Sequence, residues 1–152
     1  MKKSFILTAC FALVAFAACE KPYEYPTYEE EELPALELFS PAADTTIELD
    51  SVDEVVFAWT DLEDVNSYKI IFSLSEDMSN PKEFAAPNNP MRVKSSTMDE
   101  FIAQFGLAYE ATGTFYWSVA IWGNRETEAG VNKITFKRKK EVIIPYEERI
   151  AE

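Results

Sequence analysis

The sequence predicts an all-β domain, an antiparallel β-sandwich with one short helix. From Leu33 onward, short runs of alternating apolar and polar residues are separated by turn-forming residues. Aromatic residues, which strands favour, make up 14% of the chain and fall mostly within these runs. We therefore expect one sandwich over residues 33–140, followed by a polar tail at 141–152.

The alternating runs predict strands at 36–39, 46–49, 55–59, 68–74, 91–96, 114–122 and 131–137, with a short edge strand at 82–85. A period of two assigns one face of these strands to the core. The core-facing residues are Val55, Phe57, Trp59, Tyr68, Ile70, Phe72, Leu74, Phe115, Trp117, Val119 and Ile121. In the run 114–122, the residues on the opposite face are Tyr116, Ser118, Ala120 and Trp122.

A short helix is expected after residue 96. Thr97 precedes Glu100 by three residues, which is the spacing of a capping box. Phe101, Ile102 and Phe105 share a face before Gly106 ends the helix, so it should cap one end of the sandwich. The basic run 137–140 should lie in solvent at the end of the last strand, and 142–144 offers at most one further pairing.

The N-terminus reads as a secretory signal over residues 1–18. Lys2 and Lys3 are followed by an apolar run at 5–16 and by small Ala17 and Ala18. The run is shorter than the roughly 20 residues that a membrane-crossing helix needs. The residues 16–19, Phe-Ala-Ala-Cys, resemble the lipobox, in which signal peptidase II cuts before a cysteine that then carries diacylglycerol. The resemblance makes Cys19 the lipidation site, with ordinary secretion as the alternative.

Two neighbouring segments complete the N-terminal interpretation. Leu7 to Cys10 is also a lipobox-like stretch, but cleavage there would leave too short an apolar run, so Cys10 is assigned to that run. Residues 19–32 combine two prolines, three tyrosines and six glutamates without apolar periodicity, which predicts an extended acidic tether.

Charge and composition exclude several functions. The formal charge is −13 and falls by two more units when Lys2 and Lys3 leave with the signal, which argues against a nucleic-acid partner. The chain has no histidine, and Cys19 is the only thiol after cleavage, so a disulfide, a metal, a cofactor and catalysis are not expected. Two further sites are conceivable at residues 61–66: a pair of glycosidase carboxylates, formed by Asp61 with Glu63 or Asp64, and a calcium site formed by these acids with Asn66. We favour a solvated turn over both.

With these residues in place, the chain resembles the N-terminal module of SusE-type outer-membrane lipoproteins from the glycan-uptake systems of Bacteroidetes. The resemblance covers 36–137 and rests on the motifs at 38–41, 55–59, 65–73, 97–107 and 113–119 in this order. It implies an immunoglobulin/fibronectin-III-like fold and a non-enzymatic accessory role in binding starch or another polysaccharide beside an outer-membrane transporter. It also implies a cell-surface position, since the acidic residues after Cys19 resemble an outer-face export signal.

Aromatic side chains bind sugars through their ring faces, so a glycan site needs exposed rings. Trp59 and Trp117 are assigned to the core. Trp122 lies on the opposite face at a strand end, and with Tyr116, Asn124 and Arg125 it forms the candidate glycan site. The alternative is a spacer or docking module that packs on a transporter or another surface lipoprotein through the 82–85 edge or the 137–140 strand end.

Overall fold

The computed structural model describes residues 33–123, 127 and 129–143. The expected signal at 1–18, the tether at 19–32, Asn124, Arg125 and residues 144–152 of the tail lie outside this description. The described elements are β1 (Leu38–Ser40), β2 (Thr45–Glu48), β3 (Glu54–Trp59), β4 (Tyr68–Ser73), β5 (Lys82–Ala86), β6 (Met91–Lys94), α1 (Ser95–Ala103), β7 (Thr112–Ile121) and β8 (Asn132–Lys137).

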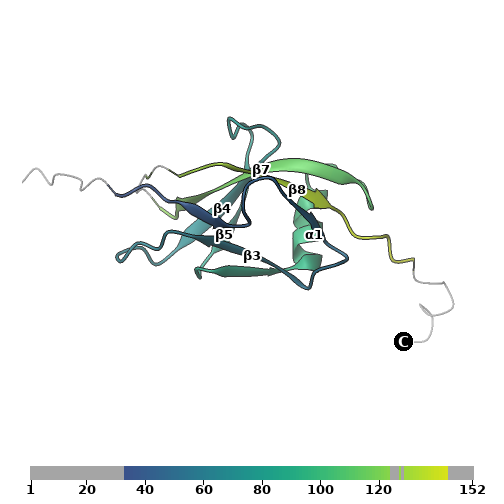
Figure 1. Cartoon of the computed structure of the whole chain (residues 1–152), viewed down its shortest axis with the longest axis horizontal. Helices are drawn as coiled ribbons and strands as arrows, with labels where there is room; N and C mark the ends of the chain where they lie inside the picture. Colours follow the sequence, from purple (N-terminus) through teal and green to yellow (C-terminus); the bar gives the residue numbers. More distant parts are fainter. Residues whose placement is uncertain (1–32, 124–126, 128, 144–152) are drawn as a thin grey trace, which may run out of the picture. The chain divides into compact units, whose positions relative to one another are not determined.

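The strands form two sheets (Figure 1). One has the order β1-β3-β6 and the other the order β2-β8-β7-β4-β5. In the lettering of immunoglobulin domains, β1, β3 and β6 take the places of strands A, B and E, and β4, β7 and β8 take those of C, F and G. The protein is thus an immunoglobulin-like β-sandwich with one short helix, which confirms the predicted fold class.

One strand pair departs from the expected antiparallel pattern. Strand β2 runs parallel to β8, with Thr45 opposite Ile134 and Glu48 opposite Lys137. The chain leaves β1 in the smaller sheet and crosses to the larger one, where the Asp44 N–H donates to the Lys133 carbonyl at 2.7 Å. The alternation of a short run shows which face is buried but not the direction of the neighbouring strand, so the sequence could not predict this pair.

The core lies between the sheets, where the predicted inward faces of β3 and β7 are buried. The Phe57 ring meets the Trp117 ring edge-on at 5.2 Å and the Phe72 ring at 5.8 Å. One facing prediction was wrong, because Leu74 lies beyond the end of β4 with 56% of its surface exposed. Ser118 alternates with Trp117 and Val119 as predicted, but it is buried, and its Oγ donates to the Gly130 carbonyl at 2.8 Å.

Helix α1 begins three residues earlier than the capping box predicted, since Lys94 and not Thr97 is at the N-cap position. Strand β6 ends at Lys94, which makes no side-chain cap, so Thr97 falls within the first turn and not before it. The Ser95 N–H donates instead to the Asp53 carbonyl at 2.8 Å, so a distant loop supplies the acceptor. At the other end, Gly106 has φ +84°, which confirms the predicted glycine stop.

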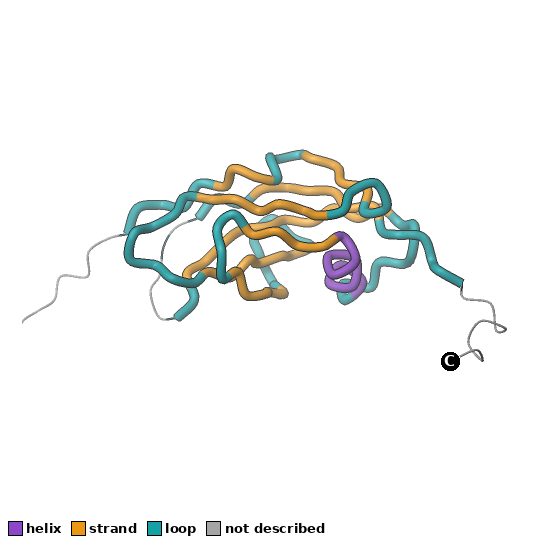
Figure 2. Tube along the Cα trace, turned by 90° about the horizontal axis from the view of Figure 1, so that it is seen from below, coloured by secondary structure: helices purple, strands orange, loops and turns teal. Residues whose placement is uncertain are grey.

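The helix caps one end of the two layers, as predicted (Figure 2). Phe101 reaches the Phe72 ring of β4 at 5.4 Å and the Phe84 ring of β5 at 5.0 Å, and Phe105 meets Phe115 of β7 at 5.3 Å. These edge-on contacts join the helix and the turn that follows it to three strands of the larger sheet.

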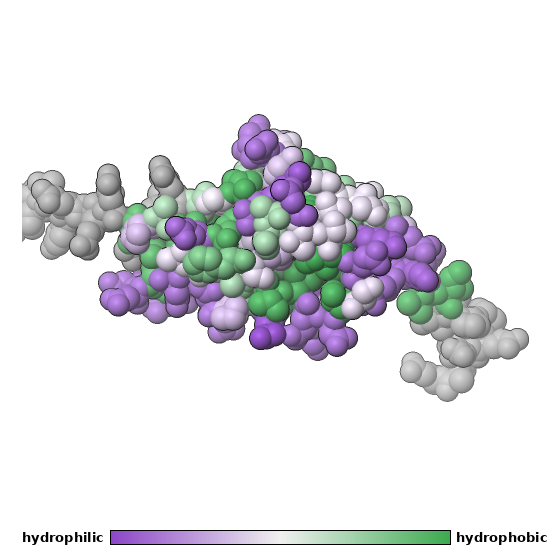
Figure 3. Space-filling view, viewed as in Figure 1, coloured by the Kyte–Doolittle hydropathy of each residue, from purple (hydrophilic) through white to green (hydrophobic). Residues whose placement is uncertain are grey.

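The chain after β8 differs from the expectation. Arg138, expected in solvent, is buried with 6% of its surface exposed. Val142 and Ile143 belong to no strand and are 82% and 79% exposed, and hydrophobic atoms stand beside the grey C-terminal segment in Figure 3. Within the described part of the chain, no helix has the length and apolar character needed to cross a membrane.

Candidate functional site

Trp122, which the sequence placed in the glycan site, is exposed to solvent in the structure. It directly follows β7 and 54% of its surface is exposed. Its backbone N–H donates to the Ser67 carbonyl at 3.0 Å, so the residue is fixed to the start of β4. Gly123 then turns the chain with φ +113°, a conformation that side-chain-bearing residues rarely adopt. The backbone that carries the indole is therefore held to β4 by a hydrogen bond.

A lysine lies next to the Trp122 ring and is paired with a glutamate. The Lys69 Nζ is 6.0 Å from the ring centroid and 2.8 Å from the Glu83 Oε2. Lys69 stands between Ala120 on β7 and Ala85 on β5. We call Trp122, Lys69, Glu83, Ala85 and Ala120 the Trp122 surface. It combines a flat apolar ring with a donor and an acceptor, the groups that bind sugars.

Tyr116 is not part of this surface. It is half-buried on the same outer face of β7, but six residues from Trp122, or about 20 Å along an extended strand. Its register neighbours are Ser73 on β4 and Lys133 on β8. One pyranose ring cannot touch both aromatic rings. Asn124 and Arg125 lie outside the described residues, as does Cys19.

The other two tryptophans belong to the core, as predicted. Trp59 is 2% exposed and Trp117 is fully buried. Trp59 meets the Tyr68 ring edge-on at 5.2 Å. Neither ring is available to a ligand.

The Trp122 surface lies at the end of the sandwich where the chain enters it. The Gly130 N–H donates to the Leu36 carbonyl at 3.2 Å, and the Thr127 hydroxyl donates to the Pro34 carbonyl at 3.1 Å. The segment that follows Trp122 is thus bonded to the first described residues. Helix α1 lies at the opposite end of β7, since Phe105 packs on Phe115.

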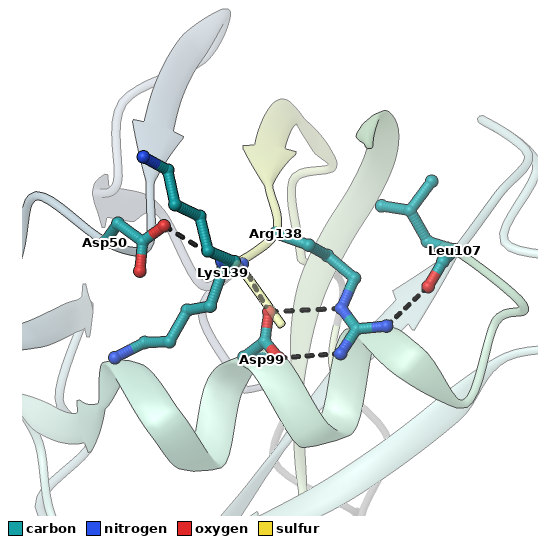
Figure 4. Close-up of polar contacts among 6 residues, drawn as sticks. Asp50, Asp99, Leu107, Arg138 and Lys139 are labelled. Atoms are coloured by element: carbon teal, nitrogen blue, oxygen red, sulfur yellow. Dashed lines mark hydrogen bonds and ion pairs between the residues drawn. The ribbon is translucent and has the colours of Figure 1, made fainter. Parts of the chain in front are cut away.

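A buried ion pair at that opposite end escaped the sequence analysis (Figure 4). The Arg138 Nε and Nη2 donate to the two Asp99 carboxylate oxygens at 3.1 and 2.7 Å, and Nη1 donates to the Leu107 carbonyl at 2.6 Å. The Lys139 N–H adds a third bond to Asp99 at 2.9 Å, and the centroid of the Tyr109 ring lies 4.4 Å from the guanidinium carbon. This cluster fastens α1 to the end of β8.

One signal in the sequence pointed to that cluster. Asp99 is four residues after Ser95 and three before Ile102, so it shares their buried helix face and needs a buried partner. Burial alone would raise the pKa of Asp99, but the bonds from Arg138 and Lys139 outweigh it and hold that pKa below its ordinary value. The carboxylate stays charged and occupied, which suits a structural role.

The acidic turn at 61–66 contains a further hydrogen bond. The Tyr68 hydroxyl accepts the Leu62 N–H at 2.9 Å and donates to the Asp61 carboxylate at 3.2 Å. Burial is the main cause that raises the pKa of Tyr68, and Asp61 adds to it. Among the described residues, no three acidic side chains gather closely enough to suggest a metal site.

An apolar groove of about 350 Å³ lies between the sheet edges β5 and β6 and helix α1. Its lining residues are Phe84, Ala85, Met91, Val93, Thr97, Met98, Glu100, Phe101 and Gln104. Pro81 and Pro87 flank β5, and Pro90 precedes the four-residue β6. Prolines and short strands discourage further strand pairing, so the groove offers apolar contact more than backbone hydrogen bonds.

Comparisons with known proteins show no family for this chain. No family model matches the chain, and no curated protein matches it significantly. Among solved structures, the fibronectin(III)-like modules of Clostridium thermocellum CbhA align with 71% of this chain and 99% of their own. The identity is 14% and the TM-score 0.37.

Proposed function

We propose that this protein is a lipid-anchored lipoprotein of the bacterial outer membrane that takes part, without catalysis, in binding and taking up a polysaccharide such as starch. The proposal follows the resemblance to the N-terminal module of SusE-type lipoproteins. The observation that carries it is the exposed Trp122 ring beside the Lys69–Glu83 pair. A rigid ring face with adjacent polar groups is the arrangement that binds a pyranose.

Polysaccharide binding can be tested by affinity electrophoresis of the full chain in detergent, in native gels containing soluble starch or galactomannan. We expect at least one polysaccharide to retard the wild type and Trp122→Ala to abolish the retardation. Phe39→Ala is the matched control, because Phe39 is 57% exposed but lies on β1 of the other sheet. If no polysaccharide retards the wild type, or if both variants behave alike, the glycan proposal fails.

The anchor is supported by the sequence around Cys19 and has its own test. Metabolic labelling with a palmitate analogue should mark the wild-type chain and the Cys10→Ser variant. Cys19→Ser should lose the label and leave the membrane fraction. Labelling that survives Cys19→Ser would contradict lipidation at this position.

A docking module remains the second candidate, and the apolar groove between β5, β6 and α1 favours it. Burial of Phe84 and Met91 by a partner would supply hydrophobic contact. In that case the transporter should co-purify with the chain from native membranes, Met91→Lys should abolish the complex, and Trp122→Ala should leave it intact. The opposite dependence would favour the Trp122 surface.

A further inference from the structure

We propose that the Trp122 surface selects neutral polysaccharides over those rich in uronic acids, and that the Lys69–Glu83 pair sets this preference. The inference rests on the proposed glycan binding and deepens it by naming the class of sugar. Lys69 and Glu83 were not among the residues that the sequence placed in the site.

The first argument is local charge. The Lys69 Nζ lies 2.8 Å from the Glu83 Oε2, so the cation beside the Trp122 ring is already neutralised. The Glu83 side chain is 45% exposed and that of Lys69 is 29% exposed, so the carboxylate is the more accessible partner. A uronate approaching the ring therefore meets an occupied cation and a like charge.

The rest of the outer face follows the same pattern. Lys133 pairs at 2.6 Å with Asp44, which directly precedes β2, and Lys137 pairs with Glu48 of β2 at 3.6 Å. Each of these three lysines on the outer face of the larger sheet thus has an acid beside it, and the chain carries a formal charge of −13. This face gives a polyanion no net attraction over the distances that steer binding.

The second argument is hydrogen-bond chemistry. A carboxylate accepts and an ammonium donates, so the pair matches neighbouring sugar hydroxyls, of which one donates and the other accepts. Hydrogen bonds to a charged carboxylate are stronger than neutral ones. The separation of 6.0 Å between Nζ and the ring centroid is at the outer limit of a cation–π contact, and the ring stays 54% exposed. A sugar can therefore lie on the indole with its hydroxyls beside the pair.

The test compares two substitutions that each remove one negative charge from a lysine-paired glutamate. Glu83→Gln changes the Trp122 surface, whereas Glu48→Gln changes the equivalent pair on β2. Dissociation constants of the full chain are measured by affinity electrophoresis with soluble starch, galactomannan and polygalacturonate. Thermal melting of each variant shows that it is folded.

The wild type should bind a neutral polysaccharide and not polygalacturonate. Glu83→Gln should weaken neutral binding about three- to tenfold, the loss expected for a hydrogen bond, and should bring measurable, salt-sensitive binding of polygalacturonate. Glu48→Gln should leave both unchanged.

The outcomes separate this inference from the function on which it rests. Polygalacturonate binding by the wild type, or equal effects of Glu83→Gln and Glu48→Gln, overturns the inference and leaves glycan binding standing. Failure of every polysaccharide to retard the wild type overturns both.

Discussion

Arg138 and Asp99, 39 residues apart in sequence, form a two-pronged ion pair that is almost completely buried. The side chains are 7% and 8% exposed. Because Asp99 belongs to α1 and Arg138 follows β8, the pair fixes the capping helix to the larger sheet.

We expect Asp99→Ala to lower the free energy of unfolding by about 3–5 kcal/mol, because it leaves the Arg138 guanidinium buried without its counter-charge. Urea denaturation of the full chain measures the change. Glu54→Ala is the control, since Glu54 pairs with Arg92 at 3.5 Å on the surface and should contribute at most about 1 kcal/mol. Equal effects would show that the buried pair does not hold the helix.

The same pair should make stability depend on pH in acid. The pKa of Asp99 is lower in the folded protein than the value of about 3.9 expected when unfolded. Its contribution is therefore fully present above that value and is lost as the pH falls through the lower, folded pKa. The stability difference between the wild type and Asp99→Asn, measured by urea denaturation, should be large at pH 7 and smaller at pH 3. A constant difference would contradict this linkage.

Tyr68→Phe should destabilise the domain by about 1–3 kcal/mol, the cost of leaving a buried donor unsatisfied. The substitution removes the hydroxyl that accepts the Leu62 N–H and donates to Asp61, while the ring contact with Trp59 remains. Thermal and urea unfolding measure the loss. Tyr109→Phe serves as the comparison, because Tyr109 is 51% exposed and its ring stacking on Arg138 survives.

Gly106→Ala should cost about 1–2 kcal/mol although nothing lies within 4 Å of the added methyl group. The cost comes from φ +84° alone, a conformation that alanine disfavours. Gly130→Ala is the control, because its methyl would meet the Leu38 Cγ at an ordinary 3.9 Å and its φ is not positive. If the two substitutions had equal effects on the urea midpoint, backbone strain would not be the cause.

The sequence by itself determined the sandwich, the strand faces and the burial of Trp59 and Trp117. These features follow from the alternation of apolar and polar residues, which is visible within each run. In a strand that has a neighbour on each side, this alternation places every second side chain between the two sheets. Trp122 was placed correctly on the exposed face for the same reason. Its partners were missed, because Lys69 and Glu83 come from strands whose register the sequence does not state.

Only the tertiary structure decided where α1 begins, which way β2 runs and what Arg138 does. The Ser95 N–H is satisfied by Asp53, and Arg138 is neutralised by Asp99. In a run of basic residues, an arginine is most stable in water unless folding brings it a buried carboxylate. Because such partners are remote in the chain, a local pattern can show that a residue such as Asp99 is buried but cannot identify its partner, which is decided by tertiary packing.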